Sequence, residues 1–165
     1  MTTRASKLLL LAGVAAMYTL VVFNNLTDFN SNYEIVRHVL RMDTTFPNNQ
    51  GMWRAVNAPL IQLAFYLCVM AWEIVTMALL WWGVIGLIHA LRLPVRAFES
   101  AKRIPLTALT LSLLMWLVAF LTVGGEWFLM WQSHVWNGQD AAFRNFTVVG
   151  IVLLLLLRPE TETQP

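Results

Sequence analysis

Charged residues are scarce in this chain of 165 residues. Only 12% of the sequence is Asp, Glu, Lys or Arg, whereas soluble domains carry about 25%. At the same time 58% of the residues are hydrophobic. This balance excludes an ordinary soluble domain and predicts an integral membrane protein.

Cysteine is nearly absent as well. The single cysteine, Cys68, excludes an internal disulfide, and no thiolate or metal-binding cysteine motif surrounds it. Because Cys68 lies inside an apolar run, we expect it to be buried as a small hydrophobic residue.

The sequence also lacks the patterns of several functional classes. The formal net charge is only +2 and no basic block occurs, so nucleic acid is not an expected partner. We find no internal repeat, no catalytic constellation and no pair of histidines at matching depth for a haem. No cofactor is predicted, and the function classes that remain are mainly non-catalytic.

Four long apolar segments account for most of the chain. They predict transmembrane helices at about 8–26, 60–91, 104–131 and 141–157. The first apolar run continues past any signal-peptide cleavage site, so we interpret it as a retained helix. The predicted fold is an all-α bundle of four transmembrane helices, forming one integral membrane domain over residues 1–165.

A polar loop at residues 27–59 joins the first two segments and has a helix of its own. Ser31 and Glu34 fit a capping box, which predicts a helix from about Asn32 to Met42. Its apolar residues fall on one face and its charged residues on the other. Asn48 and its neighbours signal a turn after this helix, and Pro59 is typical of the first turn of the next one.

The charged side of this amphipathic helix is the predicted outer-loop face for a partner or ligand. A helix lying at the membrane surface explains the same pattern, and Glu34 is spaced to pair with Arg37 and His38. The residues of this face, with the flanking acids, are Asp28, Glu34, Arg37, His38, Arg41 and Asp43.

Orientation follows from the Lys and Arg residues of the short loops. Seven of the 11 basic residues lie on one predicted side: Arg4, Lys7, Arg92, Arg96, Lys102, Arg103 and Arg158. The other four, Arg37, Arg41, Arg54 and Arg144, lie on the opposite side. Both termini are therefore predicted to be cytoplasmic, and loop 27–59 is predicted to be outside.

Two carboxylates inside apolar segments, Glu73 and Glu126, are candidates for an intramembrane polar site. They could share a proton or a cation, or lie near Arg144. Two structural roles compete with this interpretation. Glu126 would pair with Arg144 across a short turn, and Glu73 would bond to a hydroxyl such as that of Tyr18.

Metal binding has weak support in the sequence. His38 and His134 are both predicted outside, where acids could complete a mixed nitrogen and oxygen site. Their spacing fits no established metal motif, so the metal assignment stays open. Aromatic residues near the third segment, Trp127, Phe128, Trp131 and Trp136, are typical of an interfacial belt.

Several motifs of the loop resemble those of a known family. They are Asn24-Asn25-x-Thr27-Asp28-x-x-Ser31-Asn32, Arg37-His38-Val39-Leu40-x-Met42-Asp43-Thr44-Thr45-Phe46-Pro47 and Trp53-Arg54-Ala55. On these residues the chain resembles a bacterial family of predicted small integral membrane proteins, domain of unknown function 2165. The resemblance implies four membrane helices and a bacterial source, and it implies no activity, cofactor or catalytic residue.

We therefore expect a non-catalytic accessory or assembly subunit of the bacterial inner membrane, bound to a membrane protein partner or to copies of itself. Two alternatives stay open. One is a small proton- or ion-coupled transporter that uses Glu73 and Glu126. The other is a subunit of a metal- or quinone-linked membrane oxidoreductase.

Overall fold

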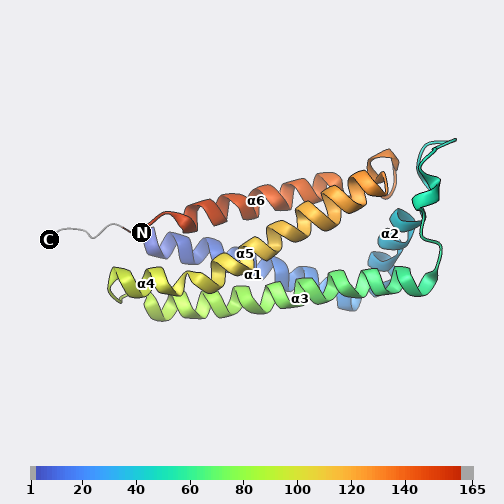
Figure 1. Cartoon of the computed structure of the whole chain (residues 1–165). Coiled ribbons are helices and arrows are strands. Elements are labelled where there is room, and N and C mark those ends of the chain that lie inside the picture. Colours follow the sequence, from blue (N-terminus) through green and yellow to red (C-terminus); the bar gives the residue numbers. More distant parts are fainter. Residues whose placement is uncertain (1–2, 161–165) are drawn as a thin grey trace. The chain divides into compact units, whose positions relative to one another are not determined.

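The computed structural model describes residues 3–160, and these form helices and no strand. Figure 1 labels the α-helices along the chain. The order is α1 (Thr3–Thr27), α2 (Phe29–Arg41), η1 (Met52–Arg54), α3 (Pro59–Ala90), α4 (Val95–Ala101), α5 (Arg103–Leu114), η2 (Met115–Trp127), η3 (Met130–Gln132) and α6 (Gln139–Leu157). The all-α prediction is confirmed.

Within residues 3–160, four helical segments are long and apolar enough to cross a membrane, as predicted. They are Thr3–Thr27, Pro59–Ala90, Val95–Trp127 and Gln139–Leu157. The third span differs most from the prediction, because it begins at Val95 with α4. The predicted start was about residue 104, but Pro94 is the N-cap of α4 and the chain is helical from Val95. The span ends at Trp127, before the predicted Trp131.

The last part of the third span is a π-helix, which the apolar pattern did not predict. In η2 the helical turn is wider, because hydrogen bonds join residues five apart. The Phe128 N–H donates to the Val123 carbonyl at 3.0 Å, and the Thr122 hydroxyl donates to the Leu117 carbonyl at 2.9 Å. π-helical turns are rare and are frequently found at functional sites.

The chain forms two compact units, which we describe separately. Unit 1 contains residues 1–22, 73–113 and 147–165, and unit 2 contains residues 23–72 and 114–146. Each of the four long spans contributes residues to both units. The descriptions below are restricted to residues 3–160.

In unit 1 the spans pack closely through small and apolar side chains. Leu11, Leu80, Leu87 and Leu109 are fully buried. At Gly83, a Cβ atom would lie 2.9 Å from the Pro105 ring, so α3 and α5 approach too closely for any side chain there. The Tyr18 hydroxyl lies 2.6 Å from the Ser112 hydroxyl, which joins α1 to α5 through buried polar atoms.

A cluster of charged side chains lies at the ends of the helices in unit 1. We call it the basic end cluster; it consists of Arg4, Lys7, Glu99, Lys102 and Glu160. Lys7 Nζ donates to Glu160 at 2.6 Å, and Lys102 Nζ donates to Glu99 at 2.6 Å. Both lysines also donate to the Arg158 carbonyl. Lys7 is 5% exposed and Lys102 is 2% exposed, so these pairs are part of the packing.

In unit 2, α2 packs its apolar side onto the end of the third span. Buried Leu40, Met42 and Phe128 form the centre of this core. α2 begins at Phe29, and Asp28 at its N-cap makes no side-chain capping bond. The predicted capping box at Ser31 and Glu34 is therefore wrong, because both residues already lie inside the helix.

Candidate functional site

The charged side of α2 is held by ion pairs within the helix and its C-terminal turn. Glu34 lies 2.7 Å from Arg37 and 3.4 Å from His38, which confirms the predicted pairing. Asp43 lies 2.9 Å from His38 Nδ1 and 3.6 Å from Arg41. The turn that places Asp43 there depends on Met42, which adopts a left-handed conformation with φ of 54° and buries its side chain.

Residues after α2 are tied to the segment that follows η2. Thr44 Oγ1 donates to Ser133 Oγ at 2.8 Å, and the Phe46 N–H donates to Gln132 at 3.1 Å. The Arg54 guanidinium donates to the Trp127 carbonyl at 2.9 Å. We call this assembly of residues 29–56 and 126–136 the loop cap.

A stacked ring pair links the charged side of α2 to the second segment of the loop cap, residues 126–136. The His38 ring lies 4.6 Å from the Trp136 ring with only 7° between their planes. His38 therefore contacts Glu34, Asp43 and Trp136 at once. These contacts define its orientation without burying it, since its side chain is 22% exposed.

Exposed aromatic side chains cover part of the loop cap. Trp53 is 75% exposed and meets Trp127 edge to face, with 5.8 Å between the rings. Arg54 lies over both rings, 5.8 Å and 5.5 Å from their centres. Phe46 and Trp131 form a second exposed edge-to-face pair. We call these five side chains the aromatic surface.

The predicted aromatic belt stays a prediction for its tryptophans, and the burial of its residues differs. Trp127 and Trp131 are exposed, but Phe128 is buried at 4% exposure in the core of unit 2. The belt prediction is wrong for Phe128, because the chain turns after η2 and directs this ring inward. The sequence placed Trp53 in a family motif but not beside Trp127, because that position depends on the fold of the loop.

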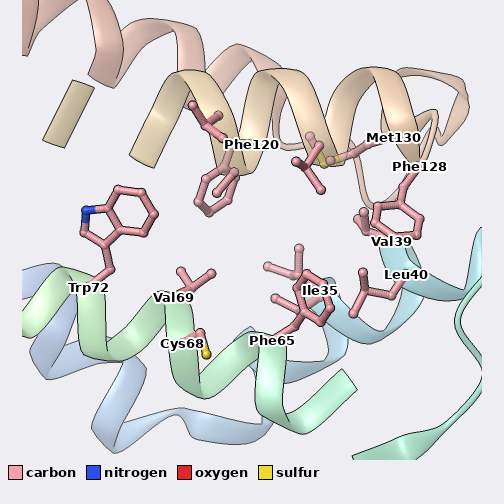
Figure 2. Close-up of a pocket in the computed structure, with 15 residues that line it drawn as sticks. Ile35, Val39, Leu40, Phe65, Cys68, Val69, Trp72, Phe120, Phe128 and Met130 are labelled. Atoms are coloured by element: carbon pink, nitrogen blue, oxygen red, sulfur yellow. The ribbon is translucent and has the colours of Figure 1, made fainter. Parts of the chain in front are cut away.

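An apolar cavity of about 260 Å³ lies beneath α2 in unit 2. Its walls come from α2, α3 and η2 and include Ile35, Leu40, Phe65, Val69, Phe120 and Val123. Figure 2 shows these side chains around an open space, with Trp72 at one end and Phe128 at the other. Cys68 also lines the cavity and is exposed, so its predicted burial is wrong.

Glu73 and Tyr18 both belong to unit 1 and are buried, at 3% and 0% exposure. The contact of Tyr18 with Ser112 places one hydroxyl pair in the interior of this unit. On α3, Thr76 follows Glu73 by one helical turn and is fully buried too. Carboxyl groups are rare inside transmembrane helices, and a buried one such as Glu73 is a candidate functional residue.

Glu126 and Arg144 belong to unit 2, and both are exposed. Among the described residues no ion pair joins them, so the predicted Glu126–Arg144 pair is absent from this structure. Asp28 is exposed as well; its backbone N–H donates to the Asn24 carbonyl, and its own carbonyl accepts from Asn32. A site shared by Glu73 and Glu126 stays a prediction.

His38 and His134 both lie in unit 2, and His134 is exposed. Within residues 3–160, no group of three or more His, Cys, Asp or Glu side chains is placed to hold a metal ion. His38 has partners of another kind, two carboxylates and the Trp136 ring.

Comparison with known proteins agrees with this architecture. No curated protein and no solved structure matches the chain. A family model described as a predicted small integral membrane protein matches residues 3–159, nearly the whole chain. With four apolar helices able to span a bilayer, the chain belongs to the integral membrane family known as domain of unknown function 2165.

Proposed function

We propose that this protein is a non-catalytic accessory subunit of the bacterial inner membrane, which binds a membrane protein partner through the loop cap. The observation that carries the proposal is the ordered aromatic surface. Residues 42–58 contain only the short helix η1, yet hydrogen bonds from the Thr44 and Arg54 side chains and the Phe46 N–H tie them to residues 127–133. Long ordered loops of this kind commonly carry function.

The chemistry of the aromatic surface suits protein recognition. Trp and Arg are the residues that most often dominate binding energy at protein interfaces. Here Arg54 is already oriented by a carbonyl and two indole rings, so little side-chain freedom would be lost when a partner binds. Membrane-interface tryptophans are the competing explanation, and the experiment below separates the two.

The charged side of α2 would form the rim of the same interface. The acidic and basic side chains of this face pair with one another and stay partly exposed. These ion pairs therefore contribute little binding energy by themselves. They would set the orientation of the partner through complementary charge.

An outside location of the loop cap is part of the proposal. Support comes from the basic end cluster, which brings Arg4, Lys7 and Lys102 together with residues 91–93 and 158–160 in unit 1. This is the set of segments that the positive-inside rule assigns to the cytoplasm. In a Cys68→Ala background, Asn48→Cys should react with a membrane-impermeant maleimide in intact cells, and reaction only after lysis would reverse the orientation.

The test of partner binding is purification of the full chain from native membranes in a mild detergent, with mass spectrometry of bound proteins. We expect a stoichiometric partner that is reduced at least about tenfold by Trp53→Ala, since a central aromatic anchor contributes about 2 kcal/mol or more. Trp82→Ala is the matched control, because Trp82 is 62% exposed on α3 in unit 1. Equal losses in both variants, or a chain that purifies alone, would contradict the proposal.

A second candidate function, proton- or ion-coupled transport, rests on Glu73. Buried carboxyl groups in membrane-spanning helices commonly belong to ion or substrate pathways, and Glu73 is 3% exposed. The flux of protons or other ions into vesicles that contain the protein should disappear in Glu73→Gln and persist in Trp53→Ala. A Glu73→Gln variant that keeps all flux would exclude this role for Glu73.

A further inference from the structure

We infer that the apolar cavity beneath α2 is a binding site for one acyl chain of a membrane phospholipid. This site is separate from the aromatic surface through which we propose that a partner binds. The inference rests on the composition of the walls, the dimensions of the cavity and the surroundings of a membrane protein.

The walls of the cavity favour a hydrocarbon and disfavour a polar ligand. No charged side chain lines it, and the contributions of α2, α3 and η2 are aliphatic and aromatic apart from the thiol of Cys68 and the indole of Trp72. A polar group that entered would lose its hydrogen bonds to water and gain few in return. A quinone head group would meet the same difficulty, because ligand sites orient such groups with placed donors and acceptors.

The dimensions fit a slender chain. A volume of about 260 Å³ exceeds the engineered apolar cavity of about 150 Å³ that binds benzene. Phe65, Val69 and Trp72 line one wall along α3, and the seven helical steps from Phe65 to Trp72 span about 10 Å. Figure 2 shows the wall residues on both sides of this length. A helix is about 10 Å across with its side chains, so a helical segment of this length occupies far more than the volume of the cavity.

Two further observations identify the source of the chain. Four apolar spans place this protein among phospholipids, so acyl chains surround it at high concentration. The amphipathic helix α2 lines the cavity with Ile35, Val39 and Leu40 and carries its charged residues on the other side. A phospholipid whose head group stays in the interface beside such a helix can place one tail in the cavity.

The experiment uses the full chain in vesicles of dioleoyl phosphatidylcholine. One per cent of the lipid carries a photoreactive diazirine in the middle of one acyl chain. After irradiation, mass spectrometry locates the adducts. We expect them to concentrate on residues 65–72 and 118–124, compared with exposed apolar residues of unit 1 such as Ile85 and Leu154.

A filling variant and a matched control sharpen the result. Ala119→Trp places an indole in the cavity, and we expect it to lower adducts at residues 65–72 at least about fivefold. Ala64→Trp makes the same change at an exposed position of unit 2 outside the cavity and should leave them unchanged. If Ala119→Trp fails to fold, Cys68→Trp fills the cavity from an exposed position on another wall.

Three outcomes would overturn the inference. Adducts spread evenly over all exposed apolar faces would indicate ordinary solvation by lipid. Adducts at residues 65–72 that persist in both filling variants would exclude the cavity as their location. Loss of the adducts when one per cent of an isoprenoid quinone replaces unlabelled lipid would assign the site to a different ligand. Partner binding is measured separately with Trp53→Ala, so either proposal can fail alone.

Discussion

Units 1 and 2 use their charged residues in opposite ways. In unit 1, Lys7 and Lys102 are almost fully buried, and each donates to a carboxylate and to the Arg158 carbonyl. In unit 2, the paired residues of α2 keep about a fifth to two fifths of their side chains exposed. Burial without partners is costly, so the paired lysines of unit 1 are structural, whereas the paired charges of α2 in unit 2 remain available for recognition.

The largest expected effect comes from breaking a buried pair of unit 1. Lys7→Met leaves Glu160, whose side chain is 8% exposed, without its closest cation. We expect a loss of about 2–3 kcal/mol in the free energy of unfolding, measured by denaturant titration in detergent. Arg41→Met removes the exposed partner of Asp43 and should cost less than about 1 kcal/mol. Similar losses in both variants would remove the distinction between the units.

Packing around two glycines provides an intermediate test of the same comparison. A Cβ at Gly83 would clash with Pro105, whereas a Cβ at Gly124 would make ordinary contacts, 3.5 Å from Met130 Cε. We expect Gly83→Ala to destabilise unit 1 by about 1–3 kcal/mol. Gly124→Ala should be neutral or stabilising, since alanine favours a helix over glycine by about 1 kcal/mol. Thermal unfolding in detergent ranks the two, and the reverse ranking would contradict the described packing.

The smallest expected effect concerns the pair formed by His38 and Asp43. A double-mutant cycle with His38→Ala and Asp43→Ala should give a coupling energy of about 0.2–1 kcal/mol, because both side chains are partly exposed. The same single variants should alter the rate of partner binding more than the stability of the protein. A coupling energy of several kcal/mol would place this pair with the buried pairs of unit 1.

Some features of the loop cap were accessible from the sequence and others were not. The amphipathic pattern predicted α2, and the spacing of Glu34 to Arg37 and His38 predicted their pairing, because both are consequences of helical periodicity. The stacking of His38 on Trp136 and the contact of Arg54 with Trp127 join residues far apart in the chain. No local pattern encodes such contacts.

Composition and the lengths of the apolar runs by themselves determined that this chain forms four membrane-spanning helices, since a bilayer requires long uninterrupted apolar segments with satisfied backbone groups. Pro59 marked the start of α3 for an equally local reason. Only the tertiary structure decided that Cys68 lines a cavity, that Phe128 is buried and that two lysines are enclosed by their partners. Burial depends on which helices meet, and the periodicity of one helix does not specify its neighbours.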